Sequence, residues 1–101
     1  MTDTLTFNQA MKKHLQTLKL YVPIVARVHG SHHPEFHDVH RLFDTIVEKT
    51  EKAGSNKPEL NEEFARLQEI TDTYTVPEGV CESYEAVYSM LAELDRAYRA
   101  G

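Results

Sequence analysis

The sequence contains one cysteine, Cys81, and no tryptophan among its 101 residues. A single cysteine excludes an intramolecular disulfide and any multi-cysteine zinc or iron–sulfur site. No apolar run approaches the roughly 20 residues that cross a bilayer. Residues 1–9 also lack the basic and then apolar order of a signal peptide. We therefore expect a cytoplasmic protein that does not bind membranes.

Positive charge is also scarce, since 11 Lys and Arg face 16 Asp and Glu and give a formal net charge of −5. This balance repels a phosphate backbone, and no basic run offsets it, so we expect no nucleic-acid partner. A Gly-rich phosphate loop, a nucleophile–histidine–acid set and a metalloprotease helix motif are all missing from the sequence. The sequence therefore predicts a protein that is not an enzyme.

The composition is that of one folded domain, which we place at residues 1–101. Hydrophobic residues make up 41% of the chain and charged residues 27%, which is ordinary for a globular protein. Four segments repeat apolar residues every three or four positions, and no stretch alternates as a strand would. With short connections between them, these segments predict an all-α fold, a single antiparallel four-helix bundle.

The first predicted helix covers residues 7–28. Thr6 and Gln9 have the spacing of a capping box, and Gly30 is expected to end the helix. Pro23 predicts a kink or a break near residues 20–22, because proline removes a backbone hydrogen bond and clashes with the preceding turn. The expected core stripe is Phe7, Met11, Leu15, Leu18, Val22, Val25 and Val28.

Each of the other three predicted helices begins at a proline, which suits the first helical turn. The second runs from Pro34 and Glu35 to Ala53 and Gly54, and residues 54–57 form a polar turn. The third starts at Pro58 and fades over residues 71–76, and the fourth starts at Pro77 and Glu78. The expected core stripes are Phe36, Val39, Phe43, Ile46 and Val47; Leu60, Phe64, Leu67, Ile70 and Tyr74; and Val80, Tyr84, Val87, Leu91, Leu94 and Tyr98.

Histidine is over-represented in one short stretch, because five of the six histidines lie in residues 29–40. At about 100° per residue, part of this stretch forms one polar stripe beside the apolar face of the second helix. The stripe consists of His33, His37, His40 and Asp44. His29 and His32 lie in the turn before it.

Three interpretations of this stripe stay open. Imidazoles three or four residues apart can hold an iron or zinc ion, with Asp44 or Glu35 completing the site. The stripe can equally be a solvated boundary between core and surface, with His33 capping the helix and His29 packed in the turn. It can also be a surface whose charge depends on pH.

Cys81 and the tyrosines receive structural interpretations. Cys81 lies near the positive end of the fourth helix, which favours a reactive thiolate, but it also borders the apolar face. We expect it to be buried and inert. The four tyrosines of the second half are expected to be core or interface residues: Tyr74, Tyr84, Tyr88 and Tyr98.

Two segments together carry a family signature. The first contains the residues Val25-Ala26-Arg27-Val28-His29-Gly30 and His33-Pro34-Glu35-Phe36, and the second contains Tyr74, Pro77-Glu78, Cys81, Tyr84 and Val87-Tyr88. In this combination the chain resembles the repair-of-iron-centres family, which are hemerythrin-like di-iron proteins of bacterial iron–sulfur cluster repair under stress. The resemblance covers most of residues 20–98 and implies a hemerythrin-like four-helix bundle.

The family's di-iron site does not carry over. The resemblance implies histidines on all four helices and two His-x-x-x-Glu pairs, yet no histidine follows His40. The alignment places two of the ligand positions near Asn8 and Lys57. His29 and His33 match the signature but are not bridging-site ligands. We therefore expect a shortened relative without a di-iron site.

These observations predict a small non-enzymatic bundle that acts through a protein partner or through self-association, in a stress-related or iron-related pathway. Wide apolar faces on the third and fourth helices would favour a homodimer. The alternative is an iron–sulfur cluster repair factor that binds iron or zinc through the histidines of residues 29–40. No other cofactor is expected.

Overall fold

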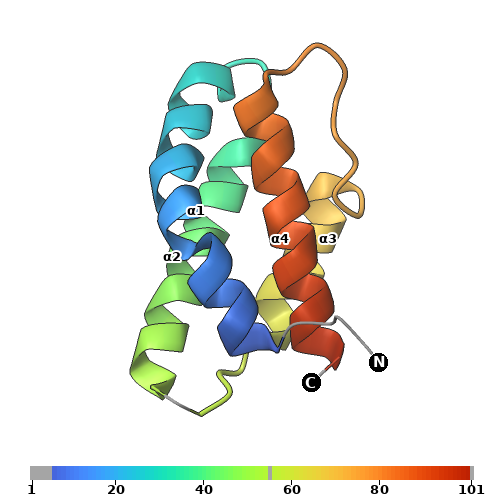
Figure 1. Cartoon of the computed structure of the whole chain (residues 1–101). Helices are drawn as coiled ribbons and strands as arrows, with labels where there is room; N and C mark the ends of the chain where they lie inside the picture. Colours follow the sequence, from blue (N-terminus) through green and yellow to red (C-terminus); the bar gives the residue numbers. More distant parts are fainter. Residues whose placement is uncertain (1–5, 55, 101) are drawn as a thin grey trace, which may run out of the picture.

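The computed structural model of the chain describes residues 6–54 and 56–100. These residues contain four helices and no strand: α1 (Phe7–His29), α2 (Glu35–Ala53), α3 (Asn61–Thr71) and α4 (Glu82–Ala100). α1 packs against α2 and α4, and α2 packs against α3. Successive helices run in opposite directions (Figure 1). The predicted all-α four-helix bundle is confirmed.

α1 begins with the predicted capping box. The Thr6 hydroxyl accepts the Gln9 backbone N–H at 3.1 Å, and the Gln9 side chain accepts the Thr6 N–H at 3.0 Å. Gly30 follows the helix as predicted. The predicted break is wrong, because α1 continues through Pro23. Pro23 is exposed, so its ring points away from the core that the flanking residues build.

α2 has the predicted bounds, Glu35 to Ala53, and buries Phe36, Val39, Phe43 and Ile46. Two expectations fall partly outside the described residues. They are the polar turn at residues 54–57 and the absence of a signal peptide at residues 1–9. None of the helices in residues 6–54 and 56–100 is long and apolar enough to cross a membrane.

α3 and α4 both begin later than their prolines predict. Residues 58–60 precede α3 because Tyr98 of α4 holds them. Its hydroxyl accepts the Leu60 N–H at 2.8 Å and donates to the Pro58 carbonyl at 3.0 Å. Residues 77–81 precede α4, and Gly79 there adopts a left-handed conformation with φ 78°. A residue with such a φ interrupts a helix. In both places the proline therefore lies in the loop before the helix rather than in its first turn.

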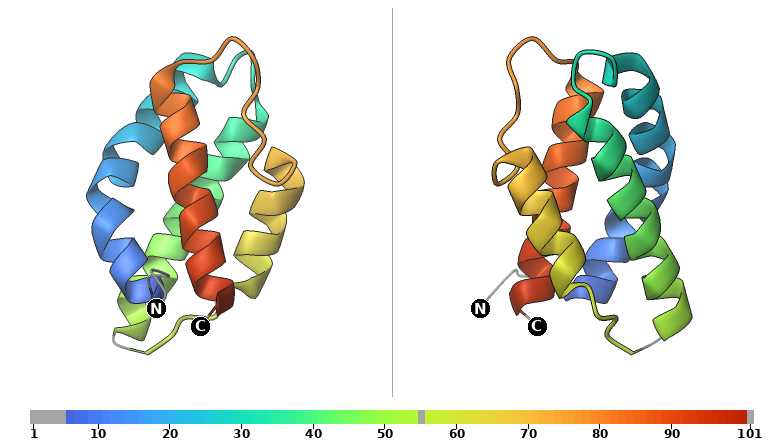
Figure 2. Two further views of the ribbon diagram at one scale, coloured as in Figure 1. Left: turned by 45° about the vertical axis from the view of Figure 1, so that its right-hand side comes forward. Right: turned by 180° about the vertical axis from the view of Figure 1, so that it is seen from behind.

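α3 is short, and the chain leaves it through an unusual bend. Asp72, Thr73 and Tyr74 have φ values of 53°, 56° and 61°, in the left-handed region that side chains disfavour. A long loop then runs to the start of α4, which lies at the end of the bundle where α1 joins α2 (Figures 1 and 2). This loop, rather than a longer α3, covers that part of the bundle.

The core contains two aromatic clusters, one at each end. Phe36, Tyr84 and Tyr88 lie with ring centroids 5.0 to 6.2 Å apart near the α1–α2 turn. At the other end, the rings of Phe7, Phe64 and Tyr98 have centroids 5.3 to 6.2 Å apart. Tyr84, Tyr88 and Tyr98 are buried and Tyr74 is half-buried, so their predicted core role is confirmed.

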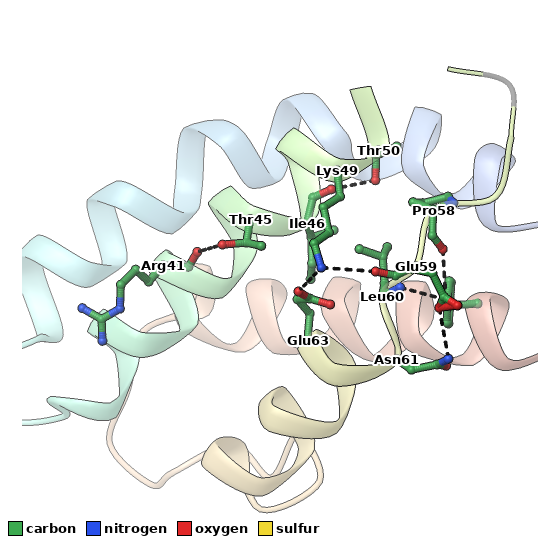
Figure 3. Close-up of polar contacts among 11 residues, drawn as sticks. Arg41, Thr45, Ile46, Lys49, Thr50, Pro58, Glu59, Leu60, Asn61 and Glu63 are labelled. Atoms are coloured by element: carbon green, nitrogen blue, oxygen red, sulfur yellow. Dashed lines mark hydrogen bonds and ion pairs between the residues drawn. The ribbon is translucent and has the colours of Figure 1, made fainter. Parts of the chain in front are cut away.

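A part-buried ion pair joins α2 to α3. Lys49 donates to Glu63 Oε2 at 2.7 Å and reaches the Glu59 carbonyl at 3.4 Å (Figure 3). Glu63 is only 7% exposed, and its Oε1 has no hydrogen-bond partner among the described residues. The hydrogen bond that Lys49 donates to Glu63, together with the nearby carboxylates, raises the pKa of Lys49, so its ammonium group stays charged.

Candidate functional site

The turn between α1 and α2 and the loop before α4 meet at one end of the bundle (Figure 1). His29 is the last residue of α1, and Cys81 directly precedes α4. His29 Nε2 lies 3.1 Å from Cys81 Sγ, although 52 positions separate the two residues. The structure therefore pairs an imidazole with the only thiol of the chain.

Cys81 is exposed, so the expectation of a buried thiol is wrong. Its carbonyl accepts the Glu85 backbone N–H at 3.2 Å, which places Cys81 at the amino-terminal end of α4. Because α4 starts five residues after Pro77, Cys81 stands on the approach to the helix rather than on its apolar face. The predicted position near the positive helix end is correct.

His29 is half-buried and held by aromatic neighbours. Its ring centroid lies 5.4 Å from that of Tyr84 in a T-shaped arrangement, and 6.4 Å from that of His33. His33 also packs against Tyr84, at 5.5 Å. Burial, followed by the hydrogen bond with Tyr88, raises the pKa of Tyr84 well above its ordinary value, so this ring stays neutral. His29 is packed as predicted, but it lies at the end of α1 rather than in the turn.

Gly30 closes the turn because it has no side chain. A Cβ at this position would collide with the carbonyl of Ala26 and with the imidazole of His37. The His37 imidazole therefore lies against the backbone of the turn at Gly30. A glycine at position 30 is the feature of the sequence that indicates this close approach.

The predicted histidine stripe is not gathered around one point. His33 Nδ1 lies 3.4 Å from Glu35 Oε2, and His40 Nε2 lies 3.6 Å from Asp44 Oδ2. His32 instead lies 3.4 Å from the Ser31 hydroxyl. No side-chain hydrogen bond caps α2, so the proposed capping role of His33 is wrong.

These pairs give the metal hypothesis no assembled ligand set. Within residues 6–54 and 56–100, no group of three or more His, Cys, Asp or Glu side chains is arranged to hold a metal ion. Whether iron or zinc binds at His33, His37, His40 and Asp44, or at His29 and His32, stays a prediction.

His14 is a buried polar residue that the sequence reasoning missed. It is 9% exposed and pairs with Glu93 of α4, and this hydrogen bond lowers the pKa of Glu93. The signal was present, because His14 lies three residues after Met11 and four before Leu18, both of which are buried. Leu15, which the predicted stripe contained instead, is only half-buried.

The exposed apolar side chains also lie elsewhere than predicted. The large exposed hydrophobic residues among those described are Leu20, Ile24 and Val28, with exposures of 60%, 39% and 59%. All three belong to α1, whereas α3 and α4 had been expected to carry the exposed apolar faces. Val28 had been placed in the core stripe and is on the surface.

Comparison with family models, with curated proteins and with solved structures found no match to this chain.

Proposed function

We propose that the chain is a non-enzymatic interaction module that uses the outer face of α1 to bind a partner protein. The observation that carries this proposal is the apolar stripe of Leu20, Ile24 and Val28. These residues are spaced four apart, so they line one side of the helix over two turns. α1 contacts α2 and α4 with its other side, which leaves the stripe open.

The charge of α1 favours an acidic partner. The helix contains Lys12, Lys13, Lys19 and Arg27 and no acidic residue. The whole chain has a net charge of −5, so the remainder carries −9. Lys19 precedes Leu20 and Arg27 precedes Val28, so a basic residue stands beside each end of the apolar stripe. Lys19 also pairs with Glu51 of α2, at 3.8 Å. A partner surface of apolar side chains bordered by Asp or Glu would complement this face.

The same charges argue against a second copy as the occupant. A two-fold contact would place α1 against α1, so that the Lys and Arg side chains of both copies would repel each other. A contact of α1 with the acidic remainder of another copy would be head-to-tail, and such contacts build rings or filaments of the chain rather than a one-to-one complex. The occupant that fits is a different protein.

The test is capture followed by a binding measurement. Proteins retained by the immobilised chain are compared with those retained by Ile24→Glu and by the control Ala65→Glu, an exposed position on α3. The retained protein is then purified and titrated. We expect one-to-one binding that Ile24→Glu weakens at least about tenfold, that Ala65→Glu leaves unchanged, and that salt weakens.

Two outcomes would overturn the proposal. In the first, Ile24→Glu binds the retained protein as tightly as the unaltered chain does. In the second, sedimentation shows a dimer of the chain that Ile24→Glu dissociates, which would make the second copy the occupant. Circular dichroism must show that both variants remain helical, which the exposure of positions 24 and 65 favours.

The resemblance to the repair-of-iron-centres family supports placing this interaction in a bacterial stress-related or iron-related pathway. The alternative is a repair factor that binds iron or zinc at the histidines of residues 29–40. Elemental analysis of untagged protein distinguishes this alternative from the interaction module. About one equivalent of iron or zinc, lost on replacing His33 and His37 with alanine, would favour the alternative. Less than a tenth of an equivalent would favour the interaction module.

A further inference from the structure

We propose that Cys81 and His29 form a nucleophilic thiol site that exchanges with small disulfides. The site is separate from the α1 stripe and needs no metal. Its basis is that the fold brings together a thiol and an imidazole from distant parts of the chain, at a position open to solvent. A thiol with an adjacent base is the arrangement that activates cysteine nucleophiles.

The geometry allows direct proton transfer. The separation of 3.1 Å between His29 Nε2 and Cys81 Sγ is within hydrogen-bond reach for sulfur. The contacts of His29 with Tyr84 and His33 hold its ring at the end of α1. The imidazole is therefore fixed, while the sulfur remains accessible to a reactant.

The surroundings of the thiol contain groups of both signs. Cys81 lies at the amino-terminal end of α4, where the backbone N–H groups carry partial positive charge. From α2 and its preceding turn come His33 and Glu35, which lie 3.4 Å apart, and from α4 comes the neutral ring of Tyr84. Next to Cys81 in sequence lies the exposed Glu82, and Glu78 and Glu85 are also exposed.

The reaction balances without an external oxidant. The Cys81 S–H proton passes to His29 Nε2, and the thiolate attacks one sulfur of the disulfide R–S–S–R. The R–S–S–R bond breaks as the Cys81–S–S–R bond forms, and the leaving thiolate takes the proton back from the imidazolium as R–SH. Cys81 is oxidised to a mixed disulfide and one R–S group is reduced to a thiol.

The exposed carboxylates define the class of reactant. Glu78, Glu82 and Glu85 lie within four residues of Cys81 and are exposed, so their negative charge repels an anionic disulfide. We therefore assign the site to small neutral or cationic disulfides. Cystamine and 2-hydroxyethyl disulfide should react faster than oxidised glutathione at low salt, and the difference should shrink at high salt.

The main test is the rate of mixed-disulfide formation with 2-hydroxyethyl disulfide, followed by intact-protein mass spectrometry between pH 6 and 8.5. An ordinary thiol slows about tenfold for each pH unit below its titration range. For the unaltered chain, the rate of mixed-disulfide formation should fall less than about threefold for each unit that the pH is lowered. At pH 6.5, His29→Gln and His29→Ala should both react at least about tenfold more slowly.

Two matched controls define the outcome. His32→Ala removes an exposed imidazole of the same turn that contacts Ser31, and it should leave the rate unchanged. Cys81→Ser should give no adduct. The proposal is overturned if the unaltered chain follows the pH profile of an ordinary thiol, a result that needs no variant to fold. It is also overturned if a folded His29→Gln reacts as fast as the unaltered chain.

Discussion

At the scale of single residues, Asp95 shows how one buried carboxylate can fix a distant loop. It is 2% exposed and accepts hydrogen bonds from Gln68 at 2.9 Å and Tyr74 at 2.6 Å, and it also pairs with Arg99. Tyr74 is the last of three successive left-handed residues. Strained backbone of this kind persists only where surrounding contacts hold it. Asp95 supplies such a contact from α4.

Replacing Asp95 with alanine should therefore destabilise the chain by about 2 kcal/mol, because it leaves the half-buried donors of Gln68 and Tyr74 without their acceptor. Urea unfolding followed by circular dichroism measures the change. The control is Asp44→Ala, an exposed position whose pair with His40 should contribute less than about 1 kcal/mol. Proteolysis within residues 72–81 should also accelerate in Asp95→Ala. Equal unfolding midpoints for the two variants would contradict this role.

At the scale of helices, Pro23 lowers the stability of α1. The helix continues through it, so the Lys19 carbonyl, four residues earlier, lacks its usual backbone donor. The exposed face tolerates this loss because water can reach the carbonyl. Proline inside a helix is nonetheless the least favourable residue.

Pro23→Ala should raise the free energy of unfolding by about 1–2 kcal/mol, since it restores one hydrogen bond and removes a clash, while the unfolded chain gains some freedom. Thermal and urea unfolding measure the gain. Gln16→Ala, also exposed on α1, serves as the control for helix propensity alone and should change stability by a few tenths of a kcal/mol. Destabilisation by Pro23→Ala would mean that the proline shapes α1 for packing.

The helices also show which structure was predictable from the sequence. The capping box of α1 and the bounds of α2 depend on neighbouring residues, and both were predicted correctly. The starts of α3 and α4 depend on distant contacts and were not. Tyr98 holds the backbone at Pro58 and Leu60, and it comes 38 positions after Leu60. Periodicity carries no information on such a contact.

The candidate site was partly predictable for the same reason. The clustering of histidines directed attention to residues 29–40, and the signature placed His29 and Cys81 among its residues. Their contact could not be foreseen, because it depends on how the loop before α4 returns to the end of α1. His14 could have been found, since it fits the spacing of the buried face, but histidine is more often a surface residue than a core residue.

At the scale of the whole molecule, tyrosine burial predicts how the bundle responds to alkali. Burial is the first cause that raises the pKa of Tyr74, Tyr84 and Tyr88 in the folded chain. The hydrogen bond to Asp95 raises the pKa of Tyr74 further, and the Tyr88 hydroxyl does so for Tyr84. In the unfolded chain these tyrosines titrate near pH 10.

The sign of the effect follows from proton binding. Above about pH 10 the unfolded chain releases protons that the folded chain retains, so the unfolded state binds fewer protons and stability falls as pH rises. Below about pH 9 both states are protonated, and these tyrosines make no pH-dependent contribution. Each tyrosine lowers the free energy of unfolding by up to about 1.4 kcal/mol per pH unit above about pH 10. The three together lower it by up to about 4 kcal/mol per pH unit.

We therefore expect urea unfolding midpoints to be nearly level from pH 7 to 9 and to fall steeply above pH 10, with tyrosinate absorbance appearing together with unfolding. Tyr74→Phe removes one of the three groups, so it should reduce the slope above pH 10 by up to about a third, whatever it does to stability at pH 7. Tyrosinate absorbance from all three rings before any loss of helical signal would contradict the assignment, because it would mean that the folded bundle ionises them freely.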